Sequence, residues 1–234
     1  MATFVLVHGA WHGGWCWSRV AKPLRQQGHI VFTPTLTGVG ERAHLLAPTI
    51  DLITHVRDIV AVVEAEELDK VVLCGHSYGG MVITGVADTV TTRIDALVYL
   101  DAFLPEPGQS MADLLPPERR QAILESAGGS WMMPSPTAAF FKVAKPDDQA
   151  WVDRRTTPHP GATMRQPLQH ARPWERVRKR VFVEAEGYRP SSFTPIAARL
   201  RQDPSWDVIG VPCGHDVMVD MPDRLVQILL AAAH

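Results

Sequence analysis

A hydroxyl group that could act as a nucleophile stands at Ser77, within residues 75–79, which read Gly-His-Ser-Tyr-Gly. The Gly-x-Ser-x-Gly pattern is typical of a serine on a sharp turn between a strand and a helix, where the flanking glycines let the backbone approach closely. An apolar run at residues 71–74, preceded by Lys70, comes before the motif, and a helix-like run at residues 81–87 follows it. This setting favours a nucleophilic serine over the alternative, a glycine-rich turn without chemistry.

A neighbouring base is needed as well, because an alcohol is a weak nucleophile near neutral pH and requires an imidazole that is itself oriented by a carboxylate. His215 is the candidate base, since it lies between the last predicted strand and the last predicted helix. Strand carboxyl ends share one edge of a parallel sheet, which places His215 beside Ser77. His8, His12 and His76 lack the spacing of metal ligands, and we expect no metal.

Acyl transfer also requires N–H donors for the negative oxygen of the tetrahedral intermediate. One donor normally belongs to the residue after the nucleophile, and the other to the loop after an early strand. Here these are the backbone N–H groups of Tyr78 and Ala10, with Gly9 permitting an unusual turn before Ala10. An ordinary strand-to-helix turn is the alternative interpretation of residues 8–10.

The elements that must position these residues alternate along the chain. Apolar runs too short for helices predict buried strands at residues 3–7, 29–33, 71–74, 96–100, 181–183 and 206–211. Amphipathic or capped stretches predict helices at residues 17–27, 51–63, 81–90, 194–201 and 223–233. This alternation predicts an α/β fold whose mainly parallel, twisted sheet carries helices on both faces.

The alternation stops between residues 104 and 179, where prolines and glycines interrupt short segments. We interpret this stretch as a cap inserted into a core that is formed by residues 1–103 and 180–234. A disordered linker is the alternative, but such a linker rarely carries many large apolar residues. The stretch contains Trp131, Phe140, Phe141, Trp151 and Trp174.

Size and charge narrow the class of protein. The 234 residues, 46% of them hydrophobic, suit one large domain with an insertion. A formal net charge of -2 gives no field that would attract nucleic acid or an anionic membrane, so we expect a small neutral partner. Three widely spaced cysteines predict reduced thiols. With no leader segment and no membrane-spanning apolar run, we expect a cytoplasmic protein.

Three motifs together resemble the α/β-hydrolase superfamily, and more narrowly its branch of plant methyl esterases, hydroxynitrile lyases and related bacterial esterases. They are VHGAWHGGWCW at residues 7–17, GHSYGG at residues 75–80 and GHDVM at residues 214–218. The resemblance extends over the predicted sheet and is weak in the cap. It implies the α/β-hydrolase fold and a Ser-His-Asp hydrolase that needs no cofactor, with a small hydrophobic ester pocket beneath the cap.

Two positions differ from the hydroxynitrile lyases of this branch. Those lyases carry a threonine where Gly9 stands, and a lysine after the catalytic histidine, where this chain has Asp216. A carboxylate at that position would repel a departing cyanide instead of stabilising it. Hydrolysis is therefore favoured over cyanohydrin cleavage.

The acid of the triad also departs from the plant esterases. Their aspartate follows the strand that comes after the cap, but here Tyr188 stands near the expected position. Asp101 ends the strand after that of the nucleophile, where some haloalkane dehalogenases and lipases of this fold carry their acid. We expect Asp101 to orient His215, with Glu186 as the alternative acid and Glu184 third.

A substrate pocket is expected between the loops at Ser77 and the cap. Its predicted residues are Trp11, His12, Phe103, Leu104 and Trp131, with Met132, Met133, Phe140 and Phe141 as further candidates. We expect a serine carboxylesterase that cleaves small hydrophobic esters. The alternatives are hydroxynitrile lyase-like C–C cleavage, lactone or amide hydrolysis, and a non-catalytic receptor for a small ligand. The sequence does not determine the oligomeric state, and a homodimer is one possible state.

Overall fold

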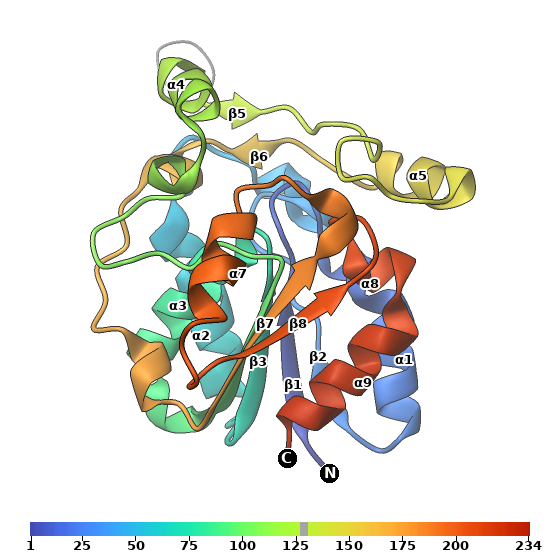
Figure 1. Ribbon diagram of the computed structural model, residues 1–234. Coiled ribbons are helices and arrows are strands. Elements are labelled where there is room, and N and C mark those ends of the chain that lie inside the picture. The colour runs from blue at the N-terminus through green and yellow to red at the C-terminus, as the bar shows by residue number, and fades with distance from the viewer. Residues whose placement is uncertain (127–130) are drawn as a thin grey trace.

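The computed structural model describes residues 1–126 and 131–234, which are built around a six-stranded parallel sheet (Figure 1). The strands run in the order β2-β1-β3-β4-β7-β8 across the sheet. Their bounds are β1 Thr3–Val7, β2 Ile30–Phe32, β3 Val71–His76, β4 Ile94–Leu100, β7 Lys179–Ala185 and β8 Asp207–Val211. The strands expected from short apolar runs are therefore confirmed.

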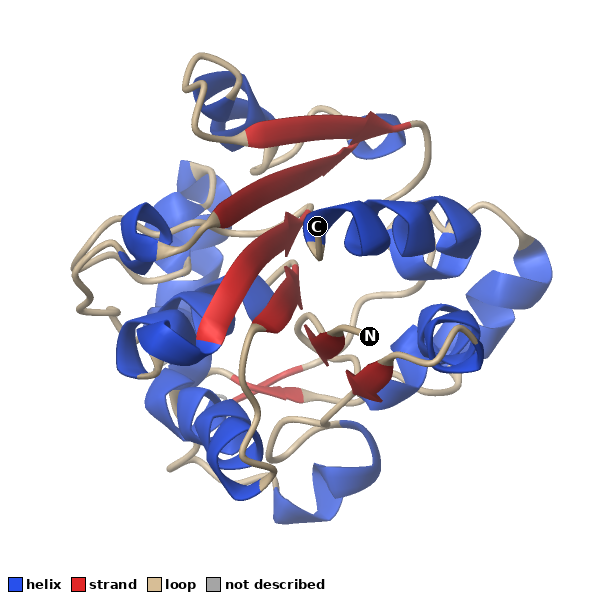
Figure 2. Ribbon diagram, turned by 90° about the horizontal axis from the view of Figure 1, so that it is seen from below, coloured by secondary structure: helices blue, strands red, loops and turns tan. Residues whose placement is uncertain are grey.

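Helices cover both faces of the sheet (Figures 1 and 2). Helices α1 (Ser18–Gln26) and α9 (Pro222–Ala232) pack on one face, and α2 (Leu52–Ala65), α3 (Gly79–Thr89) and α7 (Thr194–Leu200) pack on the other. Because both faces are covered, the strands are apolar on both sides, and β3 is buried throughout. None of the helices in the described part of the chain is long and apolar enough to span a membrane.

The order of the strands determines where a site can form. The chain passes from β1 to β2 on one side and then crosses to β3 on the other side of β1. Ligands of open α/β sheets bind at such a reversal, outside the carboxyl ends of the strands. The loops that follow β1 and β3 carry Ala10 and Ser77, so both residues lie at this point.

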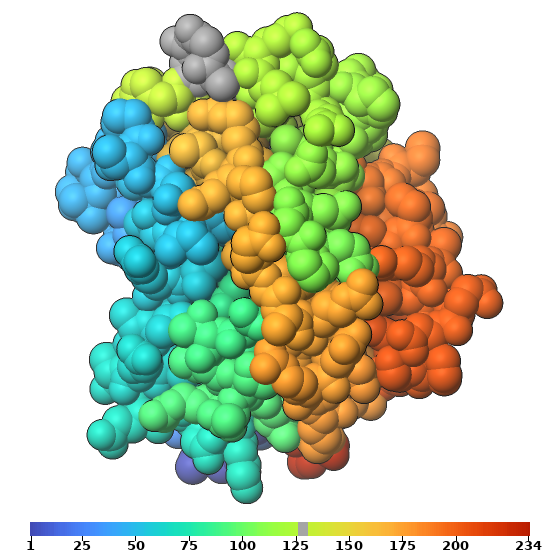
Figure 3. Space-filling model, turned by 90° about the vertical axis from the view of Figure 1, so that its left-hand side faces the viewer, coloured from blue at the N-terminus to red at the C-terminus, as the bar shows by residue number. Residues whose placement is uncertain are grey.

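Residues 104–179, which we call the cap segment, follow β4 and lead into β7; most of the segment lies over the carboxyl ends of the strands, and its last part runs down beside the core (Figure 1). The segment contains α4 (Pro117–Ser126), α5 (Pro146–Asp153), α6 (Ala162–Arg165) and a short antiparallel pair of β5 (Met132–Met133) with β6 (His159–Pro160). Residues 127–130 lie outside the described residues. Figure 3 shows the green and yellow parts of the segment at the upper end and its orange part descending along the core.

Candidate active site

Ser77 lies on the turn between β3 and α3, and its backbone is left-handed, with a φ of 55°. The glycines of the motif leave room for close backbone contacts. A Cβ at Gly75 would lie 2.5 Å from the carbonyl oxygen of Gly79, and one at Gly80 would lie 2.1 Å from that of Phe103. A strained non-glycine residue persists only where its surroundings determine its conformation. This packing therefore holds Ser77 on its turn at the sheet edge.

Asp101 and His215 meet at the carboxyl edge of the sheet. His215 Nδ1 lies 2.6 Å from Asp101 Oδ2, and the N–H of Ala185 donates to Asp101 Oδ1 over 3.1 Å. Burial raises the pKa of the Asp101 carboxyl, whereas the hydrogen bond and charge of His215 favour its ionised form. An ionised Asp101 fixes the Nδ1–H tautomer of His215 and leaves Nε2 available to accept a proton.

The other candidate acids pair with arginines. Glu184 is buried, and it accepts hydrogen bonds from Arg189 and, over 2.5 Å, from Arg201. The Glu186 side chain is 41% exposed and lies 3.3 Å from Arg189. In the described part of the chain neither carboxylate contacts His215. The geometry therefore contradicts Glu186 as the alternative acid, because its side chain is directed to an arginine at the surface.

Aromatic rings surround the imidazole of His215. Tyr188 stacks on it with ring centroids 4.7 Å apart, Phe193 stacks at 5.2 Å and Phe141 at 6.0 Å. Tyr188 stands where the plant esterases are expected to carry their acid, and here it packs on the histidine instead. These rings shield the pair of His215 and Asp101 from water and restrict the orientation of the imidazole plane.

The cap segment holds the loop of His215 through backbone contacts. The N–H of His215 donates to the carbonyl oxygen of Phe141 over 2.8 Å. A Cβ at Gly214 would lie 2.2 Å from the carbonyl oxygen of Lys142, so the two backbones touch there. The Lys142 ammonium in turn donates to the carbonyl oxygen of Gly187 over 3.1 Å. The cap segment is thus part of the support of the imidazole.

Two backbone N–H groups are available beside Ser77. Ala10 and Tyr78 line the same cavity as Ser77, and their N–H groups form no hydrogen bond within residues 1–126 and 131–234. Trp11, next to Ala10, is left-handed with a φ of 65°. A Cβ at Gly9 would lie 2.9 Å from Ser77 Cβ, so the loop after β1 passes directly against the turn of Ser77. Such free donors can bind a developing oxyanion.

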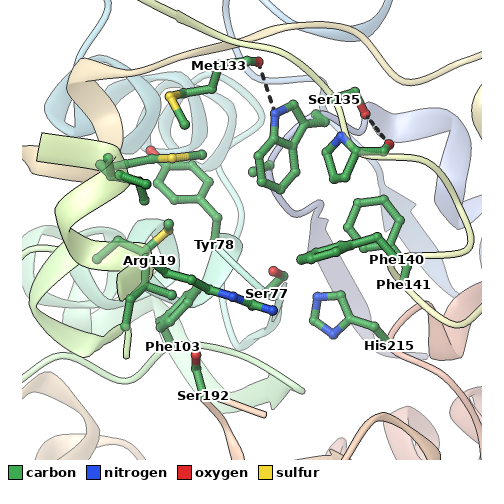
Figure 4. A pocket seen from close by; sticks show the side chains of 18 of the residues that line it. Ser77, Tyr78, Phe103, Arg119, Met133, Ser135, Phe140, Phe141, Ser192 and His215 are labelled. Atoms are coloured by element: carbon green, nitrogen blue, oxygen red, sulfur yellow. Dashed lines mark hydrogen bonds between the residues drawn. The ribbon is translucent and has the colours of Figure 1, made fainter. Parts of the chain in front are cut away.

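A cavity of about 410 Å³ lies between these loops and the cap segment. Ser77 and His215 both line it (Figure 4), and among the described residues no hydrogen bond joins them. Such contacts often shorten only when substrate is bound. The lining is mainly apolar, and the volume of the cavity suits a small ligand. The cap segment contributes Met111, Ile123, Met133, Phe140, Phe141 and Met164.

The structure separates the predicted pocket residues into two groups. Trp11 and Phe103 line the cavity, whereas His12, Leu104 and Trp131 do not. The ring of His12 is directed to a buried carboxylate, and Leu104 is packed in the apolar core. Trp131 is 38% exposed and immediately precedes β5. These three predictions were wrong because chain position alone does not determine side-chain direction.

Arg119 and Tyr188 are among the lining residues that were not predicted to form the pocket. Arg119 on α4 is the one Lys, Arg, Asp or Glu among the described lining residues, and its guanidinium lies 5.1 Å from the ring centroid of Phe140. The sequence could have indicated Tyr188 as a pocket residue, since it follows the carboxyl end of a buried strand. No sequence feature distinguishes Arg119, because it is one of several charged residues on a polar helix.

Asp216 is fully buried, and His12 Nε2 donates to its Oδ2 over 3.2 Å. It does not belong to the described lining of the cavity. The expected repulsion of a departing cyanide by this charge stays a prediction. The absence of a lysine at this position still removes the cation that the lyases carry.

No group of three or more His, Cys, Asp or Glu that could hold a metal ion occurs in the parts of the chain before residue 127 and after residue 130. The three cysteines are free. Burial raises the pKa of the Cys16 and Cys74 thiols well above the ordinary value, which disfavours the reactive thiolate.

Similar proteins are known from both sequence and structure. The model of the Alpha/beta hydrolase family matches residues 4–228. The carbendazim hydrolyzing esterase of Nocardioides sp. (strain SG-4G) is 49% identical over 242 residues, which cover 99% of each chain. Methylesterase 10 of Arabidopsis thaliana is 34% identical over 103 residues, 44% of this chain and 38% of its own length.

A similar solved structure is an extracellular alpha/beta-hydrolase from a Paenibacillus species. It superposes with a TM-score of 0.87 at 24% identity, covering 99% of both chains. At this identity the likeness concerns the fold. The arrangement of sheet, helices and cap segment is therefore shared along nearly the entire chain.

Proposed function

This chain belongs to the alpha/beta hydrolase family and is a carboxylesterase-type enzyme, and we propose that it cleaves small hydrophobic carboxylic esters through an acyl-enzyme on Ser77. In this proposal His215 is the general base and acid, and Asp101 orients it. The N–H groups of Ala10 and Tyr78 stabilise the oxyanion. The predicted fold and the resemblance to the branch of plant methylesterases and bacterial esterases are confirmed.

The first half of the reaction forms the acyl-enzyme. His215 Nε2 accepts the proton of the Ser77 hydroxyl while Oγ bonds to the ester carbonyl carbon. The carbonyl oxygen becomes an oxyanion, to which the N–H groups of Ala10 and Tyr78 donate. The intermediate collapses when the bond to the alkoxy oxygen breaks, and His215 gives its proton to the departing alcohol.

The second half returns the free enzyme. A water molecule attacks the acyl carbon, and His215 Nε2 accepts its proton. The same two N–H groups stabilise the second oxyanion. When the bond from Ser77 Oγ to carbon breaks, His215 returns the proton to Oγ and the carboxylic acid leaves.

One observation carries the proposal: the hydrogen bond of 2.6 Å between His215 Nδ1 and Asp101 Oδ2, beside a cavity that both His215 and Ser77 line. If the hydrogen bond between His215 and Asp101 only stabilised the fold, it would require neither a cavity beside it nor free N–H groups beside the Ser77 hydroxyl. The three side chains come from separate strand ends, in the order Ser77, Asp101 and His215. The triad is recognised by such geometry rather than by sequence order.

The chemistry of the lining supports the substrate class. Apolar and aromatic side chains form most of the lining, and the cavity volume of about 410 Å³ favours a small acyl and alcohol part. A relative 49% identical is named for hydrolysing carbendazim. That compound is therefore a specific candidate substrate to assay beside simple esters.

The proposal is tested by labelling the wild-type protein with a fluorophosphonate and locating the adduct by peptide mass spectrometry. We expect the adduct on Ser77 and hydrolysis of p-nitrophenyl butyrate, with both lost in Ser77→Ala. A folded wild-type protein with neither labelling nor hydrolysis would contradict the esterase proposal. Saturable binding of a small ester by that protein would then support the receptor alternative.

The lyase alternative is tested in parallel with mandelonitrile. Cyanide release that depends on Ser77 would show C–C cleavage at the same site. We expect none above the level of Ser77→Ala, because Gly9 and Asp216 replace the threonine and lysine of the lyases.

A further inference from the structure

A second histidine-carboxylate pair lies behind the proposed triad, and the mechanism does not use it. His12 is 1% exposed and Asp216 is 0% exposed. His12 follows Ala10 by two positions on the loop after β1, and Asp216 directly follows His215. The pair therefore joins the loop of an expected oxyanion donor to the loop of the expected base.

The hydrogen bonds of His12 determine its protonation state. Its Nδ1 lies 2.9 Å from the carbonyl oxygen of Ala10, and its Nε2 lies 3.2 Å from Asp216 Oδ2. A carbonyl and an ionised carboxylate can only accept hydrogen bonds. Both ring nitrogens of His12 must therefore carry hydrogen, which makes the ring a buried imidazolium.

His8 in the same loop gives the contrast. Its Nδ1 donates to the carbonyl oxygen of Gly9 over 2.8 Å, but its Nε2 accepts the N–H of Leu36 over 3.1 Å. One nitrogen donates and the other accepts, so His8 is neutral. Burial lowers the pKa of His8 to about 3. Two equally buried histidines four residues apart thus differ in charge because of their partners.

The charges of the pair support each other. Burial alone would lower the pKa of His12, but the charge and hydrogen bond of Asp216 raise it above its ordinary value. Burial alone would raise the pKa of Asp216, but His12, with His76 and His215, lowers it to about 2. His76 Nε2 lies 3.8 Å from Asp216 Oδ1, and burial together with the charge of this carboxylate raises the pKa of the Cys16 thiol.

We propose that the buried ion pair of His12 and Asp216 is a positioning pair, which holds the oxyanion loop at Ala10 and the loop of His215 in register with each other. The inference rests on the proposed function, since it concerns alignment of the donor and base assigned there. Neither residue belongs to the described lining of the cavity, so the pair acts through its neighbours.

The contacts around the pair show how alignment is transmitted. His12 holds the carbonyl oxygen of Ala10, and the adjoining N–H of Trp11 donates to His159 Nδ1 over 3.3 Å. This peptide plane is thus held from both sides, consistent with the left-handed φ of 65° at Trp11. On the other loop, His76 Nε2 donates to the carbonyl oxygen of His215 over 3.1 Å.

The wild-type protein allows a direct test of the charge. Protein labelled with ¹⁵N-histidine is examined by two-bond ¹⁵N–¹H correlation at pH 7, with His12 assigned from the spectrum of His12→Gln. We expect both ring nitrogens of His12 to be protonated, and His8 to show a single protonated nitrogen. A neutral tautomer at His12 would overturn the proposal.

The positioning role is tested with the double variant His12→Gln/Asp216→Asn, in which two amides replace the two charges and can still bond each other. Because misplacing reacting groups by about 1 Å costs on the order of 100-fold, we expect kcat on p-nitrophenyl butyrate to fall roughly 10- to 100-fold. KM should change less than about threefold, since the lining is intact. Fluorophosphonate labelling of Ser77 should slow in parallel.

The pH profile separates this role from general support of the fold. The wild-type kcat should fall as pH rises through the raised pKa of His12, because the cation is lost there. In the double variant this alkaline fall should be absent. His8→Asn, which replaces an equally buried but neutral ring, should keep the alkaline fall.

The experiments distinguish the positioning role of His12 and Asp216 from the proposed esterase function. Double variant protein with the wild-type kcat and pH profile would overturn the positioning role. If that variant does not fold, the ¹⁵N measurement and the alkaline fall of the wild-type protein still decide the charge state. Wild-type protein that is not labelled at Ser77 would instead contradict the proposed function, whatever the state of His12.

Discussion

The strand ends of the core and the cap segment contribute to the cavity in different ways. At the strand ends, Ser77 and Asp101 have left-handed backbones, and Asp101 uses both carboxylate oxygens in hydrogen bonds. In the cap segment, lining residues are held mainly by apolar packing, and Phe140 is 40% exposed. The strand ends thus carry the proposed reacting side chains, whereas the cap segment supplies much of the apolar lining and one backbone support of the His215 loop.

From this difference we expect substitutions at the strand ends to alter turnover and substitutions in the cap segment to alter substrate selectivity. Reacting groups must be held to a fraction of an ångström, and hydrogen bonds from several elements achieve this. A pocket wall for an apolar ligand requires only volume and contact area, which many side chains supply. Variants in the two regions should therefore separate into effects on kcat and effects on KM.

The largest effect is expected for Asp101→Asn. The asparagine tolerates the left-handed backbone but stabilises the wrong tautomer of His215, so kcat should fall about 10³- to 10⁴-fold. Glu186→Gln is the matched control, because it removes a carboxylate that bonds Arg189, and it should retain wild-type kcat. Steady-state kinetics on p-nitrophenyl butyrate measure both. The reverse result would transfer the orienting role to Glu186.

An intermediate effect is expected for Phe140→Ala in the cap segment. The change removes a ring that lines the cavity and lies near Arg119. Loss of this contact area should raise KM about 3- to 10-fold for esters with long acyl chains and leave kcat nearly unchanged. Comparing acetate with hexanoate esters provides the internal control. A fall in kcat alone would contradict the separation of the two regions.

The smallest effect is expected for Arg119→Met. Arg119 is exposed, so its attraction for a negative substrate is screened by water and amounts to about 1 kcal/mol or less. We expect up to about fivefold loss of kcat/KM for a mono-p-nitrophenyl ester of a dicarboxylic acid, and little change for the neutral ester of equal length. Arg119→Lys, which keeps the charge, should behave like the wild-type protein.

The sheet could be predicted because its evidence is local. The central strand β3 is an apolar run that is buried throughout, and the Gly-x-Ser-x-Gly motif marks the turn at Ser77 by close backbone approach. The site of His215 followed from the common edge of parallel strands. Asp101 was expected because some hydrolases of this fold carry their acid at that strand end, and its Oδ2 lies 2.6 Å from His215 Nδ1.

The cavity could not be predicted to the same degree, because its contacts are not local. The strands β5 and β6 have two residues each, too few to show alternation. His12 and Asp216 are 204 positions apart, and no spacing rule relates them. The direction of His12, toward Asp216 rather than into the cavity, depends on that distant carboxylate.

The backbone contact between residues 141–142 and the loop of His215 has a consequence for chimeric enzymes. A hybrid that received residues 104–179 from a relative would obtain a new pocket wall, but it would also replace the carbonyl acceptor of the His215 N–H. The new segment would have to leave room against Gly214 as well. Exchange boundaries should therefore leave residues 138–143 native, so that new selectivity can be introduced while the base keeps its support.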